Sequence, residues 1–403
     1  MRERRLKPLE HLGSICLGED EDMIILYIAL ALSLFAPIYT YTVYPFLLKL
    51  MPKKQYKIDS AYRPAVSVLV AAYNEEKIIA EKIINLSQLN YPVEKIEFLI
   101  GSDGSSDKTV EIVESYSHIK NLRVFDLPRG GKVSALNSML KEAKGELLVF
   151  SDANTMYDSK AILNLVKYFT DDRIGCVSGQ LRYKIDESSG QGAKSESIYW
   201  KYENWVKVLE SKLGRLSGAN GAIYAIKKGL IKEIRKGIIN DDFYVSTYLL
   251  QSGYDVILET EAIAYEEPND EFESQFKRHV RDGAGHYQAI IVFWRMLFPR
   301  KGSFVHVSHR VIRWTVPFFL IAAFISDLLL AKDTLFAAIL FGCQVIGYLT
   351  MGVYYLLTKK GFQNKLFNIV FYFFCVNLAL LLGFFRLVSM KQKSTWETQR
   401  RKS

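Results

Sequence analysis

Four long apolar runs constrain the fold of this chain more than any other feature, and they cover residues 23–50, 311–330, 334–358 and 366–389. A helix needs about 20 apolar residues to cross the hydrocarbon core of a bilayer, and each run meets that length. Buried helices of a soluble protein are the alternative, but such helices rarely run this long without charge. We therefore predict an integral membrane protein.

The sequence between the first and second runs is mixed and charged, which is typical of a soluble domain. We divide the chain into an N-terminal tail, a transmembrane helix, a soluble domain, and a C-terminal region of about three membrane helices with a basic tail, over 1–22, 23–50, 51–300 and 301–403. The end of the soluble domain, 290–300, is aromatic and apolar with Arg295 inside it. This pattern predicts a helix in the membrane interface, and a core helix of the soluble domain is the alternative.

Charges beside the first run predict its orientation. Acidic residues precede it and lysines follow it, namely Glu19, Asp20, Glu21 and Asp22 before, and Lys49, Lys53, Lys54 and Lys57 after. Because positive charge favours the cytoplasmic side, the soluble domain is expected in the cytoplasm, although basic residues within 2–7 weaken the bias. Three C-terminal spans would place the basic tail outside, so either one run does not cross fully or the tail is an exception.

Composition excludes several classes of protein. Apolar residues make up 49% of the chain and charged residues 24%, which is the opposite of a disordered composition. The four cysteines are far apart and show no zinc or thioredoxin-like spacing. The net charge of +9 is spread along the chain and gathers at the ends of the apolar runs, so we do not expect a nucleic-acid partner.

The soluble domain alternates short apolar strands with helices. We predict strands at 65–72, 96–100, 122–127 and 146–150, and helices at 75–89, from Asp107, and at 132–144. This alternation is typical of an α/β fold with a parallel, doubly wound sheet, in which ligands bind beyond the carboxyl ends of the strands. One rim should therefore carry Tyr73, Asn74, Glu75, Asp103 and Asp152. Neither a GxGxxG nor a Walker motif is present.

Six short motifs follow one another in the order AAYNEE, GSDGSSD, GGKVSALN, SDANT, GANGA and NDDF. With these motifs, residues 63–288 resemble the family 2 glycosyltransferases, in particular the membrane-embedded branch of poly-N-acetylglucosamine, hyaluronan and cellulose synthases. The resemblance implies a cytosolic GT-A domain, Rossmann-like with a mostly parallel sheet, joined to α-helical transmembrane segments. It also implies transfer from a nucleotide sugar with inversion at the anomeric carbon.

The resemblance assigns the first three motifs to the donor nucleotide. Tyr73, Glu75 and Asp103 occupy positions that hold uridine in the family. An Asx turn that caps the next helix is the alternative for Asp103. Lys132 follows two glycines and opens a helix, where it can meet a diphosphate together with backbone N–H groups.

Asp152-Ala153-Asn154 stands where the family has its DxD metal motif. The resemblance implies Mg²⁺ or Mn²⁺ as cofactor, and both ions favour oxygen ligands. Asn154 replaces the second aspartate and offers a carbonyl oxygen without charge. Either metal binding is weaker here, or Asn154 contacts the sugar instead.

Asp241 and Asp242 match the acidic motif that supplies the catalytic base in the family. By this alignment Asp242 takes the proton of the acceptor hydroxyl and Asp241 supports it. One carboxylate beside another can have its pKa raised into a useful range. An N-cap acidic pair at the start of a helix over 243–250 is the alternative, and both can hold together.

The family's QxxRW motif corresponds to Gln275, Arg278 and His279, with Arg281 as a second candidate for the arginine. Residues at i, i+3 and i+6 share a helical face, and an arginine there can clamp a diphosphate. In the family the tryptophan stacks beneath the acceptor sugar, so His279 puts processive synthesis in doubt. Gly218, in GANGA, is expected near the acceptor.

The resemblance implies an inverting glycosyltransferase that moves a sugar from a nucleotide sugar, expected to be a UDP-sugar, and together with the apolar runs it predicts a growing polysaccharide or glycan at the membrane as the acceptor. A single-addition enzyme acting on a lipid carrier or glycolipid is the first alternative. A non-catalytic GT-A membrane subunit is the second. The expected location is the membrane (the cell membrane in a prokaryote), which the chain crosses several times with its catalytic domain in the cytoplasm. An accessory or export subunit is an open partner.

Overall fold

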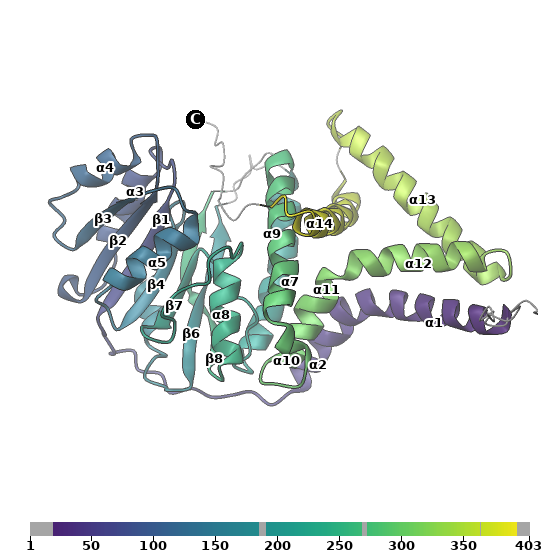
Figure 1. Ribbon diagram of the computed structural model, residues 1–403, viewed down its shortest axis with the longest axis horizontal. Coiled ribbons are helices and arrows are strands. Elements are labelled where there is room, and N and C mark those ends of the chain that lie inside the picture. Colours follow the sequence, from purple (N-terminus) through teal and green to yellow (C-terminus); the bar gives the residue numbers. More distant parts are fainter. Residues whose placement is uncertain (1–18, 185–190, 268–271, 363, 393–403) are drawn as a thin grey trace, which may run out of the picture.

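The computed structural model describes residues 19–184, 191–267, 272–362 and 364–392. Most of the predicted N-terminal tail and nearly all of the basic tail lie outside these ranges. Figure 1 shows an α/β domain built on one sheet, a group of long apolar helices, and two upright helices between them. These two helices are α7 (Gln191–Ser211) and α9 (Phe272–Val292).

Within the part of the chain that the structure describes, the sheet has eight strands in the order β3-β2-β1-β4-β7-β6-β8-β5. Their bounds are β1 Val66–Ala72, β2 Ile96–Asp103, β3 Leu122–Leu127, β4 Leu147–Asp152, β5 Met156–Tyr157, β6 Ile174–Tyr183, β7 Ile223–Lys227 and β8 Asp255–Glu266. Strands β1 to β4 are the four predicted from the sequence, and they are parallel to their neighbours in that group. Strand β7 runs antiparallel to both β4 and β6, so the whole sheet is mixed.

Helices cover both faces of the sheet. They are α3 Ile79–Ser87, α4 Thr109–Ser115, α5 Lys132–Glu142, α6 Ala161–Val166 and α8 Asp241–Gln251. Leu69 of β1 is buried in the apolar cluster that contains Leu136 of α5, whereas Val68 and Val70 are buried in the cluster that contains Ile83 of α3. Successive side chains of a strand point to opposite faces, so one continuous apolar strand supplies both layers of the core.

Among the described residues, three helices are long and apolar enough to cross a membrane, and they cover Glu21–Leu50, Leu335–Thr358 and Lys365–Val388. The first consists of α1 Glu19–Ile38, the π-helical turn η1 Tyr39–Val43 and α2 Tyr44–Leu50; the other two are α13 and α14. The predicted run 311–330 is not one straight helix, because the pieces Ser303–Trp314 and Val316–Leu330 meet at 56°. Pro317 lies in the first turn of the second piece, α12, and proline cannot donate a helical hydrogen bond.

The pieces before this bend are short. They are α10 Ser303–Val305, the π-helical turn η4 His306–Val311 and α11 Ile312–Trp314. If the bent pair counts as one span, there are up to four spans among the described residues.

Helix α14 packs directly against α9. A Cβ atom added at Gly383 would lie 2.8 Å from the carbonyl oxygen of Val280, and one added at Gly283 would lie 3.2 Å from Leu380 Cα. Small residues allow two helix backbones to approach this closely. The last apolar helix, α14, therefore packs closely against α9, the helix that carries several of the predicted site residues.

The segment 290–300 is not a separate helix. Helix α9 continues to Val292 and is followed by the 3₁₀ turn η3 (Trp294–Leu297). Ile291 and Trp294 are exposed, whereas Phe293 and Met296 are buried. The segment thus presents apolar side chains outward beside the apolar helices, an arrangement compatible with the predicted interfacial position.

Candidate active site

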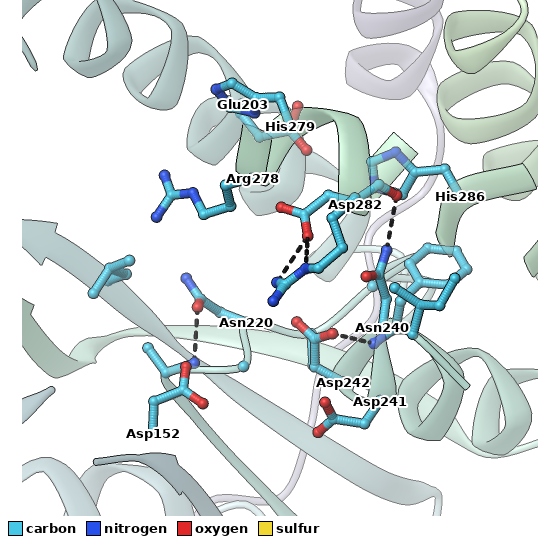
Figure 2. Close-up of a pocket in the computed structure, with 18 of the residues that line it drawn as sticks. Asp152, Glu203, Asn220, Asn240, Asp241, Asp242, Arg278, His279, Asp282 and His286 are labelled. Atoms are coloured by element: carbon cyan, nitrogen blue, oxygen red, sulfur yellow. Dashed lines mark hydrogen bonds and ion pairs between the residues drawn. The ribbon is translucent and has the colours of Figure 1, made fainter. Parts of the chain in front are cut away.

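A cavity of about 430 Å³ lies beyond the carboxyl end of β4 and continues between α7, α9 and the apolar helices. It brings together most of the predicted site residues, namely Glu75, Lys132, Asp152, Asn154, Gly218, Asp241, Asp242, Arg278, His279 and Arg281. Three predicted residues do not line it: Tyr73, Asp103 and Gln275. Figure 2 shows Asp152, Asp241 and Asp242 near one another, with Arg278 and Asp282 beyond them.

Lys132 connects two of the acidic residues. Its ammonium nitrogen lies 2.7 Å from Asp152 Oδ1 and 3.3 Å from Asp241 Oδ1. Gly131, just before it, has φ of +89°, a backbone conformation that suits glycine and turns the chain into α5. Burial alone would lower the pKa of Lys132, but Asp152 and Asp241 raise it above its ordinary value. Lys132 is therefore a permanent cation between the end of β4 and the start of α8.

Asp242 lies in the first turn of α8, where its Oδ1 accepts a hydrogen bond of 2.8 Å from the N–H of Phe243. The alternative of an N-cap acidic pair is wrong in detail, because α8 already begins at Asp241 and its N-cap is Asn240. Both carboxylates lie in the first helical turn, a position that does not compete with a chemical role. Burial first, and then the charge of Asp241, raise the pKa of Asp242 to about 6. A carboxylate with such a pKa is ionised at neutral pH and still basic enough to take up a proton.

Gly221 leaves a gap between two carboxylates. A Cβ atom added there would lie 3.2 Å from Asp242 Oδ2 and 3.7 Å from Asp152 Oδ2. Both side chains therefore border the same small space, although they come from different elements far apart in the sequence. Glycine at this position keeps the space open.

This gap fits a divalent cation only if the cation also has non-protein ligands. Among the described residues, no three His, Cys, Asp or Glu side chains group together in a way that would hold a metal ion. The amide nitrogen of Asn154 donates to Glu266 Oε1 at 2.7 Å, which leaves the carbonyl oxygen of Asn154 as its potential ligand atom. Mg²⁺ in proteins is commonly held by one or two carboxylates together with substrate phosphates, and Asp152 with Asn154 suits that pattern.

Asp103 lies behind the cavity and is fully buried. Its Oδ1 accepts hydrogen bonds from the N–H groups of Gly130 at 2.7 Å and Gly131 at 2.8 Å, and its Oδ2 pairs with Arg129. The guanidinium of Arg129 stacks on the ring of Tyr73 at 3.4 Å from the ring centre. Asp103 thus stabilises the loop that leads into Lys132. It does not form the predicted Asx turn with its own neighbours, because its hydrogen-bond partners lie in a loop more than 20 residues later.

Arg278 and Arg281 both line the cavity, so α9 presents both candidates for the family arginine. Arg281 pairs with Asp282 at 3.0 Å. His279 packs edge-on against Tyr372 of α14. Another aromatic residue, Trp314 of α11, also lines the cavity and is stacked on His286 at 4.3 Å.

Sequence reasoning missed a group of charged residues at the far end of the cavity. Glu203 Oε1 lies 2.8 Å from Arg310 Nη1, and its Oε2 lies 2.6 Å from Arg313 Nη1. Burial would raise the pKa of Glu203, but His309 and these two arginines hold it well below its ordinary value. The sequence does contain a signal for this group, because Arg310 and Arg313 lie at the start of the apolar run 311–330. Charged residues are rarely found there without a function or a partner.

The fold is shared with a solved structure of known class. A mannosyltransferase from Pyrobaculum calidifontis, described in complex with GDP-Man and Mn²⁺, superimposes with a TM-score of 0.70 over 92% of this chain and 99% of its own, at 22% identity. The α/β domain with its mixed sheet is therefore a GT-A domain. Residues 67–234 match the family described as glycosyl transferase family 2, so the chain carries a family 2 glycosyltransferase domain.

Curated relatives carry synthase names. The poly-beta-1,6-N-acetyl-D-glucosamine synthase of Staphylococcus epidermidis is 25% identical over 67% of this chain and 66% of its own length. The beta-monoglucosyldiacylglycerol synthase of Trichormus variabilis is 26% identical over 70% of this chain and 61% of its own length. The match thus spans less than two thirds of either relative.

Proposed function

We propose that this protein is a membrane-bound, inverting glycosyltransferase that uses a nucleotide sugar, with a UDP-sugar as the first candidate. The observation that carries the proposal is the shared gap at Gly221, because Asp152 and Asp242 border one space where a sugar diphosphate and an acceptor hydroxyl can meet. The apolar helices support a multi-pass membrane protein. Nucleotide sugars are cytosolic, which supports a cytoplasmic catalytic domain.

In the proposed reaction, Asp242 accepts the proton of the acceptor hydroxyl while the hydroxyl oxygen attacks the anomeric carbon from the side opposite the diphosphate. The bond between the anomeric carbon and the diphosphate oxygen breaks, and its electron pair leaves with the nucleoside diphosphate. Lys132 lies between Asp152 and Asp241 and can shift its ammonium to the diphosphate as the charge develops.

Asp152 and the carbonyl oxygen of Asn154 would hold Mg²⁺ or Mn²⁺ together with the diphosphate. When bound, such a cation neutralises charge on the leaving group. The complex described for the mannosyltransferase of similar fold supports the use of a divalent cation. Arg278 and Arg281 would add positive charge on the opposite side of the cavity.

Two classes of acceptor remain. The name of the Staphylococcus relative favours a growing polysaccharide. Single addition to a lipid-linked acceptor is favoured by His279 in place of the tryptophan and by the name of the Trichormus relative. In either case the acceptor would reach Asp242 from the end of the cavity that is lined by the apolar helices.

The experiment is a screen of UDP- and GDP-sugars against the full chain in lipid nanodiscs, with Mn²⁺, with Mg²⁺, and with a chelator. Release of nucleoside diphosphate is measured alongside product length. We expect metal-dependent release from one sugar class. Products with one added sugar per acceptor would eliminate the polymerase, and binding of nucleotide without any release would favour the non-catalytic subunit.

A further inference from the structure

The far end of the cavity lies among the apolar helices. Tyr41 of η1 and three residues of α14, Tyr372, Val376 and Leu380, line it together with Arg310 and Arg313. The same cavity reaches Asp242 at its other end. A molecule that extends from Asp242 to this end meets apolar side chains and cationic groups together, a combination that suits an amphiphile with a charged headgroup.

Lys207 of α7 lines this part of the cavity and is only 8% exposed. Its ammonium makes no hydrogen bond or ion pair with any residue that the structure describes. It lies 5.8 Å from the centre of the Trp200 ring. Lysine is almost never buried to this degree without a partner, because removal of an ammonium from water is strongly unfavourable. The missing partner is therefore the feature that needs an explanation.

The neighbouring carboxylates are already engaged by other groups. Glu203 pairs with Arg310, Arg313 and His309. Glu210 accepts hydrogen bonds from the hydroxyl of Tyr44 at 2.7 Å and from the N–H of Ser217 at 3.3 Å, and it also pairs with His309.

Three carboxylates act on Lys207 at longer range, namely Glu203, Asp242 and Glu210, and none of them forms an ion pair with it. An ammonium that is buried without an ion pair attracts an anion. Among the described residues no carboxylate pairs with Lys207, so its ammonium is available to an anionic ligand in the cavity.

We propose that Lys207 binds an anionic group, a phosphate or a carboxylate, of an amphiphilic acceptor that enters the cavity between the apolar helices. The inference rests on the proposed transferase function and names the class of its acceptor. Lys207 is a binding residue in this account, and it does not contact the reacting atoms. Arg310, which lines the same cavity, donates a hydrogen bond of 2.8 Å from its Nε to the carbonyl oxygen of Ser217.

Burial lowers the pKa of Lys207, against a smaller raising effect of Glu203. An anion beside the ammonium would favour its charged form and so offset the effect of burial.

The experiment is calorimetric titration of the full chain in nanodiscs of zwitterionic lipid with decyl phosphate, decyl glucoside and inorganic phosphate. We expect decyl phosphate to bind more tightly than decyl glucoside. Lys207→Met should raise the Kd of decyl phosphate about tenfold, as the loss of one charge-assisted hydrogen bond implies. Lys201→Met, which replaces an exposed lysine of the same helix, should leave this Kd unchanged.

Equal affinity for decyl phosphate in the wild type and Lys207→Met would overturn the proposal, as would equal affinity for decyl phosphate and decyl glucoside. Inorganic phosphate that binds as tightly as decyl phosphate would assign the site to a free anion and overturn the amphiphile. If Lys207→Met does not fold, Lys207→Arg, which keeps the positive charge, should retain the affinity of the wild type for decyl phosphate, and a loss of this affinity in Lys207→Arg would overturn the proposal. UDP titration of the same samples tests the proposed transferase function separately.

Discussion

The ammonium nitrogen of Lys132 lies 2.7 Å from Asp152 Oδ1 and so joins the start of α5 to the end of β4. Loss of this cation removes the group placed to meet a diphosphate and leaves two carboxylates without their shared partner. We expect Lys132→Met to raise the Kd for UDP roughly 10- to 100-fold in the presence of Mn²⁺. Calorimetric titration measures the Kd for UDP. The control is Lys141→Met, which replaces an exposed lysine of the same helix. Unchanged UDP affinity in Lys132→Met would remove Lys132 from the donor site.

The pKa of Asp242, raised to about 6 by burial and by Asp241, predicts the pH dependence of transfer. A base must be deprotonated to act, so kcat/KM should rise with pH through about 6 and level off above it. The rising limb should be measured with saturating Mn²⁺. A profile that is flat across this range would contradict the assignment of Asp242 as the base.

The same pKa predicts an opposite effect on stability. A carboxyl whose folded pKa lies above its ordinary value of 3.8 contributes stability at low pH that is lost as the pH rises through about 6. Asp242→Asn removes the charge that is unfavourable in this site. The variant should therefore unfold at a higher temperature than the wild type above this pH, and thermal unfolding in nanodiscs at acidic and neutral pH compares them. A lower melting temperature of the variant at neutral pH would count against the raised pKa.

The gap at Gly221 can be filled with a single methyl group. Alanine there would place its Cβ 3.2 Å from Asp242 Oδ2, tighter than an ordinary contact. We expect Gly221→Ala to fold and to lose transfer activity about tenfold or more, because small displacements of reacting groups reduce rates strongly. Gly342→Ala is the matched control, because an added Cβ there meets no atom within 4 Å. Full activity of Gly221→Ala would show that the reaction takes place elsewhere.

Lys82 is fully buried beneath the Asp152 loop and donates to Ser151 Oγ at 2.7 Å. Burial lowers its pKa to about 7 from an ordinary 10.5. A lysine with a lowered pKa contributes stability that is present above its unfolded pKa and is lost as the pH falls through about 7. The melting temperature of the wild type should therefore rise as the pH increases from about 7 towards 10.5, the ordinary pKa of lysine. Lys82→Met should lose this pH-dependent gain, whereas Lys77→Met, an exposed lysine before the same helix, should keep it.

The first half of the α/β domain could be read from the sequence because its strands are short β-branched runs with helical periodicity between them. The predicted strand over 122–127 agrees with β3 at both ends. Strand β7 was not anticipated, because its direction depends on pairing with β4 and β6, which no local pattern encodes. The bend between α11 and α12 was also missed, since hydropathy reports length and not direction.

The residues of the candidate site also fall into two groups, those that the sequence predicts and those that only the fold brings together. Asp152 and Asp242 were found because each ends or begins a regular element within a motif. The charged group around Glu203 was not found, because its members come from α7 and from the segment beside the apolar helices, more than 100 residues later. Only the tertiary fold brings these charges together, and only then is Lys207 seen to lack a partner.

The most direct test of the account is sugar transfer by Asp242→Asn beside Asp172→Asn, whose carboxylate is fully exposed on the surface. Both variants should bind UDP with Mn²⁺ as the wild type does. We predict that Asp242→Asn lowers kcat at least roughly 100-fold, as expected for loss of a general base, while Asp172→Asn transfers normally. Wild-type kcat in Asp242→Asn would contradict the account at its centre.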